Sequence, residues 1–165
     1  MVKITHRDLH RLSAAEGWLE LGDLVEAEKE LDEISAAHQN SSEVLRLRWF
    51  VQSSANSWEN ALKTATLLAD GSPHEPEPWI YRSYALHELK RTAEARDALV
   101  KVLDQFQKVS VIYYNLACYE AQLGNLDTGH RYLKKAFSLP GGKNLKLGAA
   151  SDPDLKPLKK HMAGL

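Results

Sequence analysis

The sequence predicts an all-α protein built from repeated pairs of helices. The first observation is a fixed period of 34 residues between the small residues that begin an A-x-x-x-L/A step, which are Ala27, Ala61, Ala95 and Gly129. The second is a turn position five residues before each of them, occupied by Gly22, Asn56, Lys90 and Gly124. The third is an apolar position seven residues after each of them, occupied by Ile34, Leu68, Val102 and Ala136. Such a period is typical of stacked repeats, in which each pair of antiparallel helices buries its apolar face against the next pair.

The period divides the chain into one predicted domain of four repeats and a cap. The repeats cover 8–41, 42–75, 76–109 and 110–143, and the cap covers 144–165. Within each repeat we expect the small residue where the two helices come closest, because a larger side chain would push their axes apart. The proline-rich stretch at 71–78 and the PGG at 140–142 are expected to be turns that end repeats two and four.

Helix starts are predicted from capping residues. Asp23, with Glu26 three positions on, is expected to cap the second helix of repeat one, and Ser57, Thr92 and Asn125 its counterparts. In the cap, Asp152 would be the capping residue and Pro153 the first helical residue. Pro157 would remove a hydrogen bond from such a helix, so this helix is expected to bend or to start later.

The composition excludes several classes of protein. A single cysteine, Cys118, permits neither an internal disulfide nor a cysteine-based zinc site. The sequence lacks a run of roughly 18 apolar residues, and its start lacks the apolar region of a secretory signal, so we expect a cytoplasmic protein with no membrane contact. The net charge of −1 argues against nucleic-acid binding, which usually requires a basic domain.

The two ends of the sequence carry opposite charge. Residues 1–43 hold ten acidic and four basic side chains, whereas residues 134–165 hold seven lysines and two aspartates. One interpretation is two solvated surfaces that improve solubility. The other is head-to-tail association of copies into a homo-oligomer, or attraction of the basic end to an acidic partner.

The residues that could carry chemistry do not form a predicted active site. Cys118 falls in the middle of a predicted helix, away from a helix start that would lower its thiol pKa, and is expected to pack as a small apolar side chain. His130 lies on the other predicted helix of the same repeat, and the spacing does not show whether it approaches Cys118. His6 and His10 could share a metal ion at their spacing of four, but no third ligand is evident, and solvated histidines are the alternative. His38, His74 and His161 have no partner cluster. With no phosphate-binding or nucleophile motif, we expect no enzymatic activity, no catalytic residue, no metal and no cofactor.

The period and its residues resemble the tetratricopeptide repeat (TPR) family over roughly residues 8–143, and in particular uncharacterised bacterial members. The fourth repeat matches the family pattern best, with Tyr113, Leu116, Ala117, Gly124 and Leu133. Repeat two departs from it, because Trp49 stands at the usual glycine position and implies wider helix spacing there. The resemblance implies a right-handed α-solenoid of four helix–turn–helix repeats plus a C-terminal capping helix.

The resemblance also implies a binding groove on the concave side, lined by the first helix of each repeat. Carrying the exposed groove positions of the family onto this sequence gives Leu12, Glu16, Arg46, Phe50, Tyr81, Tyr84, His87, Tyr114, Asn115 and Cys118. Aromatic rings with a polar tip suit the capture of a peptide or helix, although rings at helical spacing also occur in cores. Relatives that grip a C-terminal carboxylate use Lys, Asn and Arg here, and only Arg46 and Asn115 are of that type.

Three hypotheses for function follow. The first is a non-enzymatic adaptor or scaffold that binds a peptide or helix of a partner protein in the groove. The second is a small secretion-type chaperone that holds an exported client, which the length and repeat content resemble. The third is a structural subunit that associates with itself through its oppositely charged ends. The sequence does not name the partner.

Overall fold

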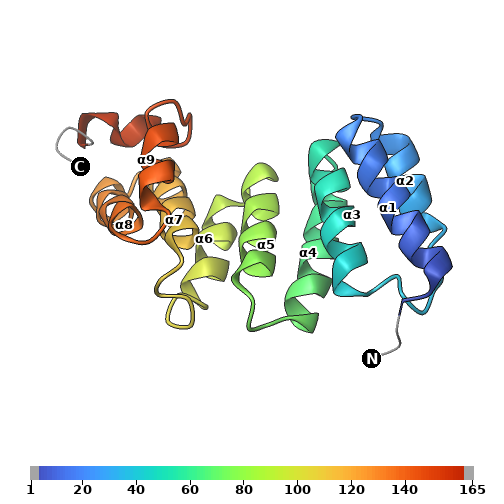
Figure 1. Ribbon diagram of the computed structural model, residues 1–165. Coiled ribbons are helices and arrows are strands. Elements are labelled where there is room, and N and C mark those ends of the chain that lie inside the picture. Colours follow the sequence, from blue (N-terminus) through green and yellow to red (C-terminus); the bar gives the residue numbers. More distant parts are fainter. Residues whose placement is uncertain (1–3, 162–165) are drawn as a thin grey trace. The chain divides into compact units, whose positions relative to one another are not determined.

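The chain folds into helices, as the sequence predicts. A computed structural model describes the backbone of residues 4–161 and the side chains of residues 4–159. Within that part there is no strand, and helices alternate with short connections (Figure 1). The elements are α1 (His6–Glu20), α2 (Leu24–Asp32), α3 (Ser42–Ser54), α4 (Trp58–Gly71), α5 (Pro76–Glu88), α6 (Thr92–Val100), α7 (Ser110–Gln122), α8 (Leu126–Ser138), α9 (Gly142–Ala149) and the 3-10 helix η1 (Lys156–His161).

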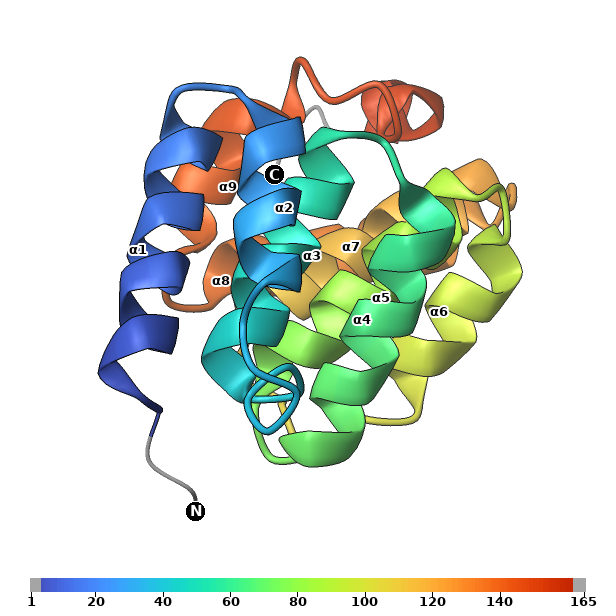
Figure 2. The same cartoon turned by 90° about the vertical axis from the view of Figure 1, so that its right-hand side faces the viewer.

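The helices are grouped into two compact units. The first unit is Met1–Ala85 and the second is Leu86–Leu165, so the division falls inside α5. In the first unit α1 pairs with α2 and α3 pairs with α4, and both views show α1 and α2 side by side (Figures 1 and 2). In the second unit α7 pairs with α8, and α6 packs on α7. That the four repeats make one domain stays a prediction.

The turns inside the four helix pairs have the same backbone conformation, which confirms the predicted turn position. The residue after the C-cap has a positive φ every time: 78° at Gly22, 54° at Asn56, 64° at Lys90 and 82° at Gly124. Each of these residues donates its N–H to the carbonyl three residues earlier, as Gly22 does to Leu19. The next residue donates its N–H to the carbonyl five residues earlier, as Asp23 does to Trp18. This Schellman arrangement satisfies the last carbonyls of the first helix and reverses the chain.

The small residues of the period lie at buried positions, as predicted. Ala27, Ala61 and Ala95 are fully buried, and Gly129 is buried as well. At Gly129 an added Cβ would lie 3.2 Å from the carbonyl oxygen of Ala117, so α7 and α8 approach closely at this residue. The four apolar residues seven positions further on are also buried: Ile34, Leu68, Val102 and Ala136.

Two apolar clusters form the core of the first unit. One is made by α1, α2 and α3, with Ala15, Leu31, Val44, Leu47 and Val51 among its buried members. In the other, Trp49 packs against three alanines, Ala61, Ala65 and Ala85. The indole at the usual glycine position is therefore accommodated by small side chains opposite it, because close packing conserves total volume.

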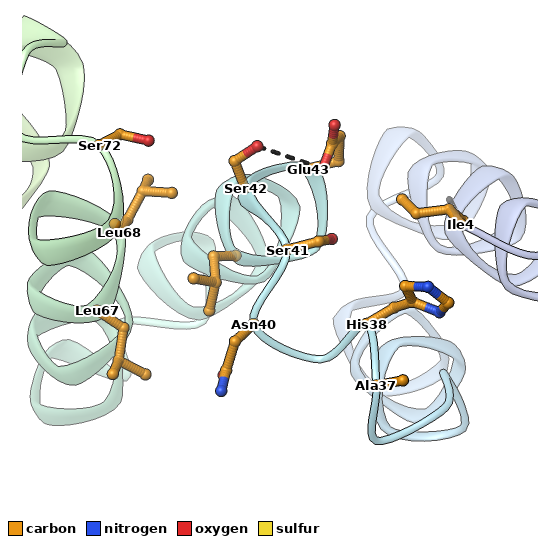
Figure 3. A pocket seen from close by; sticks show the side chains of 12 residues that line it. Ile4, Ala37, His38, Asn40, Ser41, Ser42, Glu43, Leu67, Leu68 and Ser72 are labelled. Atoms are coloured by element: carbon orange, nitrogen blue, oxygen red, sulfur yellow. Dashed lines mark hydrogen bonds between the residues drawn. The ribbon is translucent and has the colours of Figure 1, made fainter. Parts of the chain in front are cut away.

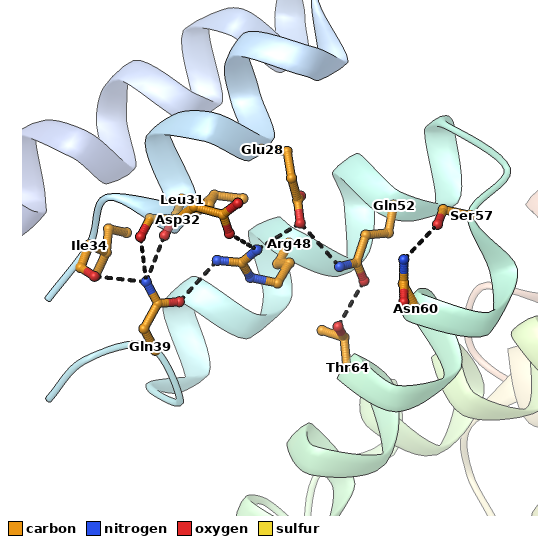
Figure 4. Close-up of polar contacts among 10 residues, drawn as sticks. All are labelled: Glu28, Leu31, Asp32, Ile34, Gln39, Arg48, Gln52, Ser57, Asn60 and Thr64. Atoms are coloured by element: carbon orange, nitrogen blue, oxygen red, sulfur yellow. Dashed lines mark hydrogen bonds and ion pairs between the residues drawn. The ribbon is translucent and has the colours of Figure 1, made fainter. Parts of the chain in front are cut away.

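A polar network connects α2 to α3 and α4 (Figure 4). Arg48 of α3 donates from Nη1 to Glu28 at 2.7 Å and to Asp32 at 2.8 Å, and from Nη2 to Gln39 at 2.9 Å. Gln52 donates to Glu28 at 3.3 Å and accepts a 2.7 Å bond from Thr64 of α4. The amide of Gln39 also bonds the carbonyls of Leu31, Asp32 and Ile34, and so closes the end of α2. Sequence reasoning did not find this network, because its partners follow no period.

Only one of the four predicted repeat caps forms as expected. Asp23 accepts a hydrogen bond from Glu26 N at 3.1 Å, which confirms that cap. Ser57 and Asn125 stand at N-cap positions but make no capping bond, and Thr92 is already the first helical residue after Arg91. Their side chains bond elsewhere: Ser57 with Asn60, Asn125 with Glu120, and Thr92 with His87.

The C-terminal part differs from the predicted cap in where its helices begin. The chain becomes helical again at Gly142, forming α9, and then runs irregularly to η1, which begins at Lys156. Asp152 does not cap a helix starting at Pro153, because one of its carboxylate oxygens binds Asp154 N at 2.9 Å and the other binds Tyr114. The later start expected from Pro157 is what occurs. Residues 162–165 of the predicted cap and the side chain of His161 lie outside the described part.

Candidate functional site

All ten residues predicted to line a groove lie on the first helix of a helix pair, on α1, α3, α5 and α7. Six of them, Leu12, Glu16, Arg46, Phe50, Tyr81 and Tyr84, belong to the first unit. The other four, His87, Tyr114, Asn115 and Cys118, belong to the second. Their role in binding stays a prediction, and each unit has its own candidate face.

In the first unit, α3 and α5 bring aromatic side chains together at the surface. Phe50 is 43% exposed and Tyr84 is 40% exposed. The Phe50 ring meets the Tyr81 ring edge-on at 5.7 Å, and Tyr81 stacks on the buried Trp49 at 4.1 Å. Tyr84 meets Trp58 edge-on at 5.6 Å. We call Arg46, Phe50, Tyr81 and Tyr84 the aromatic face.

The polar groups of the aromatic face are largely occupied. Arg46 forms an ion pair with Glu75 across to the start of α5. Burial raises the pKa of the Tyr81 phenol, against the opposing influence of the Arg46 charge, so Tyr81 stays neutral at physiological pH. The buried Trp49 Nε1 has no hydrogen-bond partner among the described residues. Phe50 and Tyr84 are the exposed residues of the face, whereas Arg46 and Tyr81 are half-buried.

The two predicted residues on α1 have different surroundings. Leu12 is half-buried and packs against the core cluster of α1, α2 and α3. Glu16, one turn further on, is exposed. Leu12 therefore fits the alternative of a core side chain, which sequence periodicity cannot distinguish from a groove side chain.

In the second unit, three predicted groove residues converge on the chain's own C-terminal segment. The Tyr114 hydroxyl donates to Asp152 Oδ2 at 2.6 Å, and Cys118 Sγ lies 3.9 Å from the same oxygen. His87 Nε2 lies 3.1 Å from Asp154 Oδ2.

The amide of Gln122, one turn after Cys118, donates to the backbone carbonyl of Asp154 at 2.9 Å. We call His87, Tyr114, Cys118 and Gln122 the tail-covered face. Asn115, on the neighbouring side of α7, is half-buried.

The environment of Cys118 makes it a poor nucleophile. The side chain is 5% exposed. Burial raises the pKa of its thiol far above the usual range, and the negative charges of Asp152 and Asp154 add to this effect. Burial likewise raises the pKa of Tyr114, with the hydrogen bond to Asp152 as the second cause. Because the thiolate is the reactive form, Cys118 acts as a packing residue and Tyr114 as a fixed hydrogen-bond donor.

A cluster of Asp8, His38 and Ser35 in the first unit, with Asp8 and His38 buried and Ser35 exposed, escaped sequence reasoning, which gave His38 no partner. His38 Nδ1 lies 2.8 Å from Asp8 Oδ2 and 3.0 Å from Ser35 Oγ, while Ser35 N and Oγ bond the Asp8 carboxylate at 3.0 and 2.7 Å. A hydrolytic triad needs the serine and the carboxylate on opposite ring nitrogens. Here both lie on Nδ1, so the cluster cannot relay a proton in that way.

The same cluster perturbs the ionisation of Asp8. The hydrogen bond from Ser35 N, followed by that from the Ser35 hydroxyl, holds the pKa of Asp8 far below its usual range. Asp8 thereby fastens the start of α1 to the loop after α2.

A pocket of about 700 Å³ opens beside this cluster in the first unit (Figure 3). It lies between the loop before α3, the start of α3 and the end of α4, and its lining includes His38, Ser41, Glu43 and Leu68. The lining mixes hydroxyl groups and apolar side chains with a single carboxylate. Its imidazole is already held by Asp8 through Nδ1.

The described residues form neither a metal-binding cluster nor a membrane-spanning helix. No three His, Cys, Asp or Glu side chains among them are grouped so that they could hold a metal ion. His6 and His10 are both exposed on α1. None of the helices in residues 4–161 has the length and apolar character needed to cross a membrane.

Comparison with known proteins identifies the fold. No protein-family model and no curated protein sequence matches the chain. Among solved structures, a crystal structure of MamA superposes with a TM-score of 0.72 at 16% identity, covering 96% of this chain and 95% of that one. MamA residues 41 to the end from Desulfovibrio magneticus RS-1 superposes with a TM-score of 0.72 at 17% identity, covering 82% and 77%. MamA is a TPR-like helical-repeat protein, and the similarity confirms the predicted all-α solenoid fold class.

Proposed function

We propose that this protein is a non-enzymatic interaction module that holds a segment of a partner protein against the first helices of its repeats. The TPR-like fold shared with the MamA structures supports a general protein-binding role. The observation that carries the proposal is the aromatic face, where Phe50 and Tyr84 stand exposed on successive first helices.

The surroundings of these two rings favour a binding role. Exposed aromatic side chains are common among the residues that dominate binding energy, because they offer a large contact area at a low cost in conformational entropy. Phe50 is backed by Trp49 and Tyr81, and Tyr84 is backed by Trp58. These contacts restrict the rings before a partner arrives, which reduces the ordering cost of association.

The charge of the aromatic face favours an apolar or aromatic segment over a free carboxylate. Arg46 is the cation of the face, and its guanidinium is paired with Glu75. A terminal carboxylate would have to compete with Glu75 for this charge. A hydrophobic side chain could cover Phe50 and Tyr84 while leaving the ion pair in place.

The chemistry of the remaining candidates supports a role without catalysis. The thiol of Cys118 and the phenol of Tyr114 are held in their protonated forms, because both pKa values are raised. The Asp8–His38–Ser35 cluster has its serine and carboxylate on the same ring nitrogen.

Site-specific photocrosslinking tests the proposal. A photoreactive phenylalanine is placed at position 50 or 84, and at Val25 of α2 as the control, because Val25 is 77% exposed and lies on a second helix. The expected result is the same crosslinked partner from positions 50 and 84 and none from position 25. Equal crosslinking from all three positions would contradict the proposal.

Truncation of the same two side chains gives a quantitative measure. Phe50→Ala and Tyr84→Ala should each weaken binding of the crosslinked partner about tenfold, which corresponds to roughly 1.4 kcal/mol and is typical of an interface hot spot. Because Phe50 is 43% and Tyr84 is 40% exposed, each substitution should lower the melting temperature less than truncation of a fully buried ring would. Unchanged affinity in both variants would remove the aromatic face from the interface.

A further inference from the structure

The C-terminal segment of the second unit occupies a face on which the sequence predicts partner binding. The segment SDPDLKPL, residues 151–158, lies on α7 and α8. We call it the tail segment. Every member of the tail-covered face, namely His87, Tyr114, Cys118 and Gln122, contacts it through a side-chain atom.

The tail-covered face contacts two acidic side chains and one backbone carbonyl of the tail segment. Tyr114 holds the Asp152 carboxylate at 2.6 Å, and His87 lies 3.1 Å from the Asp154 carboxylate. Gln122 holds the backbone carbonyl of Asp154 at 2.9 Å, a contact that any residue at this position could make. The face therefore contacts two carboxylates that are two positions apart and the backbone carbonyl of the second aspartate.

Two leucines of the tail segment fill apolar space. Leu155 and Leu158 are both fully buried. Leu158 Cδ1 would lie 3.1 Å from a Cβ at Gly129, so this leucine occupies room that the glycine of α8 leaves. Leucines three and six positions after Asp152 thus complete the recognised pattern.

The tail segment also holds its own bound shape. Asp152 Oδ1 accepts a hydrogen bond from Asp154 N at 2.9 Å, which forms a tight turn within the segment. In the described residues, the short η1 follows this turn. The tail segment is held by the polar contacts above and by its two buried leucines, so a segment that replaces it must supply both kinds of contact.

We infer that the tail segment is an internal ligand, and that the tail-covered face binds a partner segment with the pattern Asp-x-Asp-Leu-x-x-Leu. The inference rests on the proposed function, since it specifies a partner for one face of an interaction module. Because the tail segment is tethered, its effective concentration is on the order of mM, so it suppresses weak binders and yields only to a closely matching segment.

Cys118 provides the reporter for a test in the full-length protein. It is the only cysteine of the chain, and its thiol lies against Asp152. When the tail segment leaves, the thiol becomes accessible to a maleimide. The probe ligand is a synthetic peptide of sequence SDPDLKPL with both ends blocked, and the control peptide has both aspartates replaced by asparagine.

The test first weakens the binding of the tail segment to the tail-covered face and then adds the probe peptide in its place. The double variant Asp152→Asn with Asp154→Asn should raise the alkylation rate of Cys118 about tenfold, since the tethered contact then no longer competes at mM effective concentration. The probe peptide should slow the reaction of this variant again, and the asparagine peptide should not. Asp127→Asn, which changes an exposed carboxylate of α8, should react at the parent rate.

A second variant covers the case in which the double variant fails to fold. Tyr114→Phe removes only the hydroxyl that holds Asp152, and should raise the alkylation rate several-fold while leaving the helical content intact. Parent-like alkylation in the folded variants would show that the tail segment is a fixed part of the unit and would overturn the inference. Faster alkylation without protection by the probe peptide would overturn it too. Crosslinking from positions 50 and 84 is independent of both outcomes, so the proposed function stands or fails separately.

Discussion

At the scale of single residues, the fold depends on buried polar side chains whose partners are distant in sequence. Asp8, 3% exposed, satisfies its carboxylate with Ser35 and His38. Arg48 likewise joins α3 to Glu28 and Asp32 of α2. Neither arrangement could be predicted from the sequence, because a helical period marks apolar faces and carries no information about which loop side chain meets which charge.

The ionisation of Asp8 predicts how stability depends on pH. Its pKa is lowered in the folded state, against about 3.9 in an unfolded chain. The ionised carboxylate therefore stabilises the fold above about pH 4, and this contribution is lost as the pH falls below that value toward the lowered pKa.

The variant Asp8→Asn tests this predicted dependence of stability on pH. It should lower the free energy of unfolding at about pH 7, and its difference from the parent should shrink at about pH 3, where Asp8 is largely protonated in the unfolded parent chain but still ionised in the folded one. Urea unfolding at several pH values measures this. Asp70→Asn, at an exposed position of α4, is the control and should follow the parent throughout. A difference between Asp8→Asn and the parent that stays constant over this range would contradict the assignment.

At the scale of elements, the sequence predicts the turns better than the helix starts. The turn position recurs because the chain must reverse through a left-handed residue, a requirement of the backbone that glycine and asparagine satisfy and that the sequence therefore shows. Helix starts are less predictable, because Ser57, Thr92 and Asn125 have other partners available nearby. A local rule cannot foresee that competition.

Lys90 is the turn residue least suited to its conformation. Its φ is 64°, in the left-handed region that costs most residues roughly 1–2 kcal/mol. Lys90→Gly should raise the free energy of unfolding by about 0.5 kcal/mol, since the strain relieved exceeds the added flexibility of the unfolded chain. The measurement is the urea midpoint.

Lys101→Gly is the matched control for this change. Lys101 is an exposed lysine at the end of α6 with a φ of −58°, so glycine there relieves no strain and should lower stability by about 0.5–1 kcal/mol. Equal destabilisation by both substitutions would show that the turn at Lys90 is not strained.

At the scale of the whole molecule, the period of 34 residues could be predicted from the sequence. Which helix faces stay exposed and which are covered could be predicted only in part. Residues 34 positions apart occupy equivalent buried positions, because each helix pair buries the same apolar face in the same way. The same frame assigned Tyr114 and Cys118 to a groove but could not show that the tail segment covers them. That contact joins α7 to Asp152, 38 and 34 positions further on, in a segment that follows the last repeat.

Several acidic side chains near the N-terminus form ion pairs within the folded chain. Much of the negative charge near the N-terminus is paired internally: Arg11 bonds Glu30 and Glu33, Arg48 bonds Glu28 and Asp32, and Lys29 bonds Glu26. Arg11 and Lys29 already belong to the four basic side chains of residues 1–43, so only the pairs of Arg48 offset negative charge beyond the sequence count.

Hydrogen–deuterium exchange with the crosslinked partner, purified and mixed with the parent protein, tests the central claim most directly. If a partner segment lies on the first helices, exchange should slow in peptides from α3 and α5, around Phe50 and Tyr84, and stay unchanged in peptides from α2 and α4. Protection confined to α2 and α4 would place the partner on the second helices and contradict the account.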